Sequence, residues 1–526
     1  MSKVMTAKEA LAMVEDGATV VSSGFQFITN AEELMKALET RFLETGAPRD
    51  LTIMHASGQG LIGQLDLGLT HYAHEGLIKR YITGHFANNK AMIELANQDK
   101  IEVYNLPQGV ICQMYRAAAA GKSGELTKVG LKTFVDPRLE GGKVTPRTKE
   151  DIVHLVDIKG EEYLFYDAPK IDIALIRGTT ADRLGNVSME EECGVIDSQD
   201  VAMAAKANGG KVFVQVKNYV EAGSLKPKDV IIPGNLVDGI IITTDIDKYH
   251  RQTPATIYDP AMAGIYKVQT TGAAPLELND RKVIARRAAM ELRPSSTVNL
   301  GIGIPESVAT VAGEEGVTDE MILTIESGFI GGVPVGGLSF GSAVNHWAML
   351  PMATQFDFYN GGGLQVAFLG FAEISPKGDV NSSKFNKRLA GCGGFIDISQ
   401  FTPKMVFCGT MTAGGLKTSI ENGKLSIISE GKQKKFLKEI EQVTFSSEYA
   451  VEHNQEVLVV TERCVFRLTK DGFILSEVAD GIDIERDIIG QMEFTPLVQK
   501  DIKTMNPAIF SEGLIDLRKF MLCQEA

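Results

Sequence analysis

Residues 171–176 read IDIALI, and the chain continues to GNV at residues 185–187. Residues 364–369 read LQVAFL, and GDV follows at residues 378–380. The two stretches match without a gap, because their apolar cores and their glycines fall at equal spacing. Chance similarity between two strand–loop–strand segments is the alternative. A second pair of matching stretches in the same order favours two related halves.

The second pair consists of a strand, a glycine turn and a helix. In the first half the strand covers residues 19–21, the turn contains Gly24, and Asn30 has the position of a helix N-cap. In the second half the strand covers residues 297–300 and leads through GIGIP at residues 301–305 into a helix. The repeated order predicts that both halves share one fold.

Strand-like segments alternate with helical ones along the whole chain. Runs such as residues 212–216 and 457–460 are dense in β-branched residues, as in parallel α/β units. We expect two related open α/β domains, at residues 1–255 and 280–526. Residues 256–279, where Asp259-Pro260, Gly264 and the run from Thr270 to Pro275 break regular structure, would link them. Ligands of such folds bind beyond the carboxyl ends of the strands.

The composition is that of an ordinary globular protein. The chain has 526 residues, of which 44% are hydrophobic and 23% charged, and its net charge is −14. This charge argues against nucleic acid or an anionic membrane as the main partner. Six cysteines without a Cys-x-x-Cys pair indicate reduced thiols in a cytoplasmic protein. The start of the chain, residues 1–21, does not have the pattern of a signal peptide.

One acid stands out in the second half. Glu326 is the last charged residue before residues 327–356. This run contains six glycines and has no Asp, Glu, Lys or Arg. The glycines and prolines of this run make a membrane-spanning helix improbable. A carboxylate in this place can fix a loop. It can also act as a nucleophile or general base where backbone N–H groups approach closely.

Two glycine clusters are candidate ligand sites. Gly301 and Gly303 follow a strand and precede a helix, a geometry that suits a phosphate group, although a simple tight turn is the alternative. The third glycine of a dinucleotide fingerprint is missing there. Residues 391–394, Gly-Cys-Gly-Gly, can offer backbone N–H groups to an oxyanion or can mark a closely packed strand end.

Two other motifs give weaker signals. Ser339 lies in a Gly-x-Ser-x-Gly pattern, but glycines and a proline surround it instead of the strand and helix that a nucleophile elbow requires. His71 and His74 are three residues apart without the spacing of a known metal motif, so we expect no metal site.

Several of these motifs together resemble the family I coenzyme A transferases. Residues 326–328 with Gly331 and Gly332 look like the family's catalytic segment, and residues 301–305 look like its coenzyme A loop. Residues 391–394 and 356–363 also match. In the first half, residues 105–109, Asn-Leu-Pro-Gln-Gly, are similar to a motif whose glutamine faces the catalytic acid. The length of the chain is similar to that of the single-chain bacterial members.

The resemblance implies a reaction and a set of site residues. Glu326 would carry coenzyme A as a glutamyl thioester between a short-chain acyl-CoA and a short-chain carboxylate. Gln108 and the backbone N–H of Gly393 or Gly394 would stabilise oxyanions, and Gly301 and Gly303 would lie near the CoA phosphates. The active site would form between the two domains.

The same resemblance bears on cofactors and partners. Coenzyme A would be a substrate and not a tightly bound cofactor, and we expect a homo-oligomer, a dimer or a tetramer. A thioester hydrolase and a ligand-sensing protein on the same scaffold are the alternatives.

Overall fold

A computed structural model describes residues 3–60, 67–86, 89–269 and 275–523. The chain forms two compact units. Unit 1 comprises Met1–Val268, Ile325–Asp357 and Leu389–Asp397, and unit 2 comprises Gln269–Thr324, Phe358–Arg388 and Ile398–Ala526. Two stretches of the second half therefore belong to the unit that the first half builds. The division into residues 1–255, 256–279 and 280–526 stays a prediction about two related halves.

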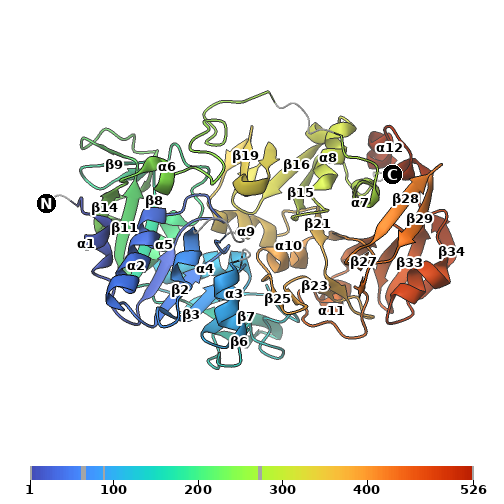
Figure 1. Cartoon of the computed structure of the whole chain (residues 1–526), viewed down its shortest axis with the longest axis horizontal. Coiled ribbons are helices and arrows are strands. Elements are labelled where there is room, and N and C mark those ends of the chain that lie inside the picture. The colour runs from blue at the N-terminus through green and yellow to red at the C-terminus, as the bar shows by residue number, and fades with distance from the viewer. Residues whose placement is uncertain (1–2, 61–66, 87–88, 270–274, 524–526) are drawn as a thin grey trace. The chain divides into compact units, whose positions relative to one another are not determined.

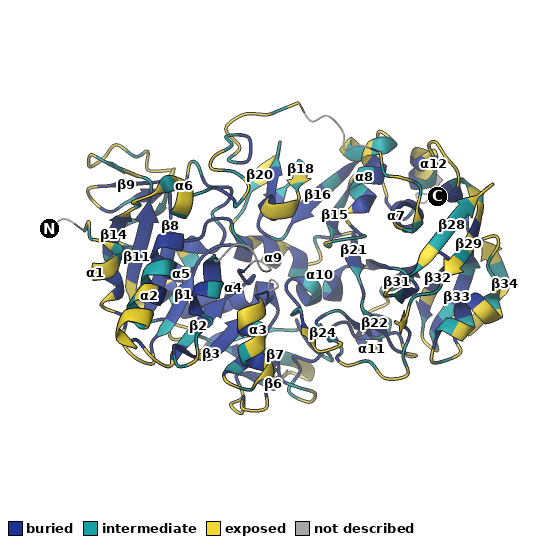
Figure 2. Ribbon diagram, in the orientation of Figure 1, coloured by how far each residue is buried: buried dark blue, intermediate teal, exposed yellow. Residues whose placement is uncertain are grey.

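The described part of unit 1 contains a seven-stranded parallel sheet (Figure 1). In spatial order its strands are β14 (Gly239–Ile242), β11 (Lys211–Val216), β8 (Ile173–Arg177), β1 (Thr19–Ser22), β2 (Leu51–His55), β3 (Ile78–Thr83) and β4 (Glu102–Asn105). Every residue of β8 is buried, and Figure 2 draws this strand in dark blue. Burial on both faces is typical of central parallel strands. The predicted α/β class is confirmed for this unit.

Helices and small sheets complete unit 1. The helices that lie wholly in this unit are α1 (Ala7–Leu11), α2 (Glu32–Thr45), α3 (Lys90–Asn97), α4 (Gln108–Ala119), α5 (Ser198–Ala207) and α6 (Ile246–Tyr249), and α9 (Met352–Asn360) begins in it. One small sheet consists of β9 (Thr180–Asp182), β10 (Val187–Ser188), β12 (Asn218–Val220) and β13 (Val230–Ile232), and a second of β5 (Gly124–Thr127), β6 (Val153–Ile158) and β7 (Glu161–Asp167). A third consists of β18 (Val333–Val335) and β19 (Ser342–Val344). Helix α5 packs against α4 and on β8 and β11.

Unit 2 contains a sheet of mixed direction. In the described part of the chain, eight strands of this ten-stranded sheet are, in spatial order, β16 (Met321–Ile325), β15 (Ser296–Leu300), β21 (Val366–Gly370), β26 (Lys404–Cys408), β31 (Glu456–Val460), β32 (Cys464–Thr469), β33 (Gly472–Val478) and β34 (Leu497–Thr504). The strands from β16 to β31 are parallel, and β32 runs antiparallel to both of its neighbours. The helices that lie wholly in this unit are α7 (Asp280–Ala289), α8 (Ser307–Glu314), α11 (Ser447–Glu452) and α12 (Leu517–Cys523), and α10 (Phe395–Phe401) ends in it. The α/β class is confirmed here too.

The repeat seen in the sequence recurs in the strand pairing. In unit 1, Ile173 of β8 is paired with Lys211 of β11. In unit 2, Val366 of β21 is paired with Lys404 of β26. Ile173 and Val366 are separated by the same number of residues as Lys211 and Lys404. The same separation aligns the two repeated segments. The halves thus share strand order and register.

The short strands that follow repeat in the same way. In unit 1, Ala181 of β9 is paired antiparallel with Val187 of β10. In unit 2, β22 (Glu373–Ile374) and β23 (Val380–Asn381) are antiparallel, and Ile374 is paired with Val380. The aligned glycines therefore sit in equivalent turns, as the equal spacing predicts.

One local prediction was wrong. The N-cap of α2 is Ala31 and not Asn30, and no side chain caps this helix. The Asn30 amide is used within the preceding loop, because it donates to the Gln26 carbonyl oxygen at 2.9 Å and accepts from Gln59. A loop contact therefore takes the place of the cap that the residue type indicates.

Phe368, fully buried in the core of unit 2, tests the packing of the β21 strand. We expect Phe368→Ala to lower the free energy of unfolding by about 3–5 kcal/mol, because it removes a large apolar side chain and leaves a cavity. Ile428→Ala is the control, since Ile428 is 65% exposed. Urea titration followed by circular dichroism measures both changes, and equal losses for the two variants would contradict the assigned core.

Candidate active site

Glu326 lies on a tight turn at the carboxyl end of the β16 strand. The Gly328 N–H donates to the Ile325 carbonyl oxygen at 2.9 Å, and the Ser327 hydroxyl donates to the Gly341 carbonyl oxygen at 2.6 Å. The Glu326 side chain is half-buried, whereas Ser327 is 1% exposed. The turn thus fixes the backbone on the carboxyl side of the acid.

The glycine of this turn is required by its surroundings. Gly328 has φ +119°, and a Cβ on it would lie 2.0 Å from the Leu350 carbonyl oxygen. The Leu350 N–H donates back to the Gly328 carbonyl oxygen at 2.8 Å. No side chain fits between these two backbones. The acid therefore has a rigid base formed by two passes of the chain.

The first half contains a copy of this turn without the acid. The β1 strand pairs with β2 in the register in which β15 pairs with β16. Along these strands, Ala56 occupies the place of Glu326, and Ser57-Gly58 occupies the place of Ser327-Gly328. Gly58 also has a positive φ, +73°. Only the second copy carries a carboxylate.

Gln108 is the first residue of α4 and is 2% exposed. Its side-chain amide donates to the Met352 sulfur at 3.3 Å. The Met352 N–H in turn donates to the Ile196 carbonyl oxygen at 2.7 Å. Met352 lies two residues after Leu350, which contacts the Glu326 turn. The glutamine of the first half and the acid of the second half are therefore held by one hydrogen-bonded framework within unit 1.

The glycine cluster at residues 391–394 joins the same framework. The Gln108 N–H donates to the Gly393 carbonyl oxygen at 2.9 Å, and the Gly393 N–H donates to the Gly84 carbonyl oxygen at 2.7 Å. The Asn105 side chain accepts from the Cys392 N–H and donates to Gly84. The Gly393 N–H is thus engaged. Among the described residues, nothing accepts from the N–H of Gly394.

The Gly301–Gly303 loop lies in unit 2, between β15 and α8. The Gly301 N–H donates to the Phe368 carbonyl oxygen at 2.8 Å. Gly303 has φ +95°, and a Cβ on it would meet no atom within 4 Å. Its carbonyl oxygen accepts from the Arg281 guanidinium at 3.1 Å. The sequence analysis did not select Arg281, which adds a cation to a loop predicted to suit phosphate.

Comparison with known proteins identifies the family of this chain. A family model described as coenzyme A transferase matches residues 4–243. The caffeate CoA-transferase of Acetobacterium woodii is 45% identical over 97% of this chain and 98% of its own. The acetate CoA-transferase YdiF of Escherichia coli is 43% identical over 97% of this chain and 95% of its own. The chain belongs to the coenzyme A transferase family.

Solved structures agree with that assignment. The apoenzyme of the Escherichia coli acyl-CoA transferase YdiF matches with a TM-score of 0.92 and 41% identity, over 98% of this chain and 97% of the other. Its thioester complex with CoA matches with a TM-score of 0.91 and the same identity. The chain is therefore a CoA-transferase with that enzyme's fold.

The remaining motifs of this transferase have structural partners. The Ser339 hydroxyl is hydrogen-bonded to that of Thr253 at 2.8 Å, in a short turn that leads into a strand and not a helix. His71 lies between Glu32 and Glu39, at 2.8 Å from each. Among the described residues, no cluster of His, Cys, Asp or Glu could hold a metal ion. The same residues include no helix long and apolar enough to cross a membrane.

Asp197 is a buried acid that the sequence analysis missed. It is 1% exposed, precedes α5, and accepts from the Gly24 N–H at 3.1 Å. Its second carboxylate oxygen has no partner among the described residues. Burial raises the pKa of Asp197 to about 7, against the opposing effect of the Gly24 N–H. Ile196, beside it, contacts Met352 in the framework of the site.

Asp197 gives the stability of this transferase a defined pH dependence. Because the folded pKa is raised, stabilisation by the neutral carboxyl is complete below about pH 4 and is lost as the pH rises through 7. Asp197→Asn stays neutral and keeps the oxygen that accepts from Gly24. We expect its free energy of unfolding, relative to the unsubstituted protein, to rise by about 3 kcal/mol between pH 5 and pH 8.

Urea titrations at both pH values measure this change. Asp229→Asn, at an exposed position, is the matched control. The same relative change in both variants would contradict the role assigned to Asp197.

Proposed function

We propose that this transferase moves coenzyme A between a short-chain acyl-CoA and a short-chain carboxylate through a thioester on Glu326. The observation that carries the proposal is the rigid, glycine-containing turn that presents Glu326. The copy of this turn in the first half has no such acid. The names of two relatives, an acetate and a caffeate CoA-transferase, support carboxylic acids as acceptors. The Escherichia coli relative was crystallised as a thioester complex with CoA.

The reaction begins with attack by the ionised Glu326 on the thioester carbonyl of the acyl-CoA. The carbon–sulfur bond breaks, and CoA leaves as a thiolate from an acyl-glutamyl anhydride. The thiolate then attacks the glutamyl carbonyl carbon and displaces the donor's carboxylate, which leaves a glutamyl-CoA thioester. An acceptor carboxylate reverses both steps, so that transfer follows a ping-pong course.

A carboxylate is a weak nucleophile, so the site must position it and stabilise two oxyanions. We assign one oxyanion to the side-chain amide of Gln108. Its present acceptor is the Met352 sulfur, a weak one, so the amide loses little on turning to an oxyanion. We assign the other to the Gly394 N–H, because the Gly393 N–H is engaged by Gly84.

Coenzyme A is long, and its far end can supply binding energy that is used at the reacting carbonyl. We assign its phosphates to the loop of Gly301 and Gly303, where space is open beside Gly303 and Arg281 adds a positive charge that the nearby Glu306 carboxylate offsets in part. In this proposal CoA is a substrate, no cofactor is tightly bound, and the chain works as a homo-oligomer.

Glu326→Gln tests the covalent step. We expect intact-mass spectrometry after incubation with acetyl-CoA to show a CoA adduct that maps to Glu326 and disappears on addition of acetate. The variant forms no adduct and loses turnover by more than about 1,000-fold, because an amide cannot act as the nucleophile.

Glu44→Gln, at an exposed position of the same unit, is the control and keeps both properties. An adduct on the Glu326→Gln variant would refute the assignment. Continuous release of acetate without an acceptor would show a hydrolase instead.

Gln108→Leu tests the oxyanion assignment. Removing one donor from such a site lowers kcat by about 100–1,000-fold, and the KM for acyl-CoA should change little because the donor acts in the transition state. Gln98→Leu is the control, since Gln98 is exposed at the end of α3. Steady-state kinetics with acetyl-CoA and propionate measure both variants. A rise in KM at unchanged kcat would refute the role.

A further inference from the structure

Lys435 is a buried cation in unit 2 that the proposed reaction does not use. It follows β30 (Gln433–Lys434) and is 8% exposed. Its ammonium lies 3.7 Å from the centroid of the Phe371 ring, and a Cβ on Gly409 would lie 2.9 Å from its nitrogen. Among the described residues, it has neither a carboxylate at ion-pair distance nor a hydrogen-bond acceptor. A buried ammonium without such a partner is costly.

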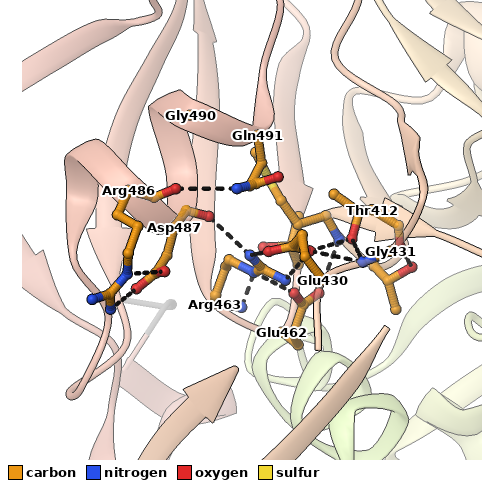
Figure 3. A network of polar contacts seen from close by, with 12 residues as sticks. Thr412, Glu430, Gly431, Glu462, Arg463, Arg486, Asp487, Gly490 and Gln491 are labelled. Carbon is orange, nitrogen blue, oxygen red and sulfur yellow. Dashed lines mark hydrogen bonds and ion pairs between the residues drawn. The ribbon is translucent and has the colours of Figure 1, made fainter. Parts of the chain in front are cut away.

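The charged groups around Lys435 are already engaged. Glu462, after β31, binds Arg463 and the Met411 N–H, and Arg463 also binds Glu430 (Figure 3). Glu373, on the strand beside Lys435, accepts from Asn381 and from the Glu441 N–H. Burial lowers the pKa of Lys435 to about 7, and the attraction of Glu462 opposes this only in part. The cluster therefore does not satisfy the ammonium.

Lys435 lies at the carboxyl edge of the unit 2 sheet. Phe371 directly follows β21, and Gly409 directly follows β26. These strands and β15, which ends at the Gly301 loop, are parallel neighbours. Two strand spacings, about 10 Å, separate the end of β15 from the end of β26. Lys435 therefore lies on the edge where open α/β sheets bind their ligands.

The same edge exposes backbone at Gly370 and Gly303, whereas the side chain of Leu369 covers Gly301 and those of Phe371 and Lys435 cover Gly409. Gly301, Gly370 and Gly409 stand at the ends of three adjacent strands. A Cβ on Gly370 would meet no atom within 4 Å, and the same holds for Gly303. A ligand can therefore lie against backbone between the Gly301 loop and the Lys435 ammonium.

We propose that Lys435 binds a phosphate group of coenzyme A, which supplies the ammonium with its missing counter-charge. The proposal rests on the proposed function, because it takes CoA as the ligand of this edge. Lysine is a common phosphate ligand that acts as a point charge. An anion beside the amine favours its charged form, so that CoA binding near pH 8 takes up a proton at Lys435.

Isothermal titration calorimetry on the full chain tests this assignment with CoA, 3′-dephospho-CoA and pantetheine as probes. We expect Lys435→Met to weaken CoA binding at least tenfold and to leave pantetheine binding unchanged, since pantetheine has no phosphate. At pH 8, titrations in two buffers of different ionisation enthalpy should show proton uptake for the unsubstituted protein and none for the variant. Lys432→Met, at an exposed position of the same segment, is the control and should behave like the unsubstituted protein.

The outcomes separate the possibilities. If Lys435→Met weakens CoA but not dephospho-CoA, the contact is with the 3′-phosphate; if it weakens both, the contact is with the diphosphate. Unchanged CoA affinity and proton uptake in a folded variant would overturn the proposal and leave Lys435 as a counter-charge of the Glu462 cluster.

A second variant covers a failure to fold. Lys435→Arg keeps the charge but cannot titrate at pH 8, so it should bind CoA without proton uptake, and continued uptake would also overturn the proposal. Absence of CoA binding by the unsubstituted protein would refute the proposed function itself.

Discussion

The backbone contact between Gly328 and Leu350 is the constraint on which the candidate site depends. The two residues approach so closely that no side chain fits at residue 328. One pass of the chain carries Glu326, and the other leads within two residues to Met352, which contacts Gln108. The positions of acid and glutamine are thereby coupled through main chain from Glu326 to Met352 and through one side-chain contact from Met352 to Gln108.

The two copies of the turn in the duplicated fold differ in what they contact and present. In the first copy, the carbonyl oxygen of Ala56 accepts from the Gly84 N–H at 3.1 Å. Gly84 in turn accepts from Gly393, so the copy without an acid supports the glycine cluster. The second copy presents Glu326. The first copy thus supports the glycine cluster, and the second presents the acid that the proposed reaction uses.

The sequence predicted what depends on local pattern and failed where distant residues decide. The equal spacing of apolar cores and glycines predicted the shared register of the β8 and β21 strands, because strand pairing preserves spacing. Asn30 was predicted as an N-cap from its residue type, but its amide is bound in the loop. The choice between Gly393 and Gly394 depends on Gly84, some three hundred residues away. The unusual surroundings of Asp197 and Lys435 arise from burial, which no nearby residue signals.

The alanine at residue 56 has a consequence for stoichiometry. Two equivalent turns in one chain could each have carried an acid, and such a chain could have held two covalent adducts at once. In the proposed reaction, in which Glu326 carries the thioester, alanine in the first copy leaves each polypeptide a single attachment point among its two related turns. Under that proposal, any cooperativity between reacting centres arises between separate polypeptides, although each polypeptide contains the fold twice.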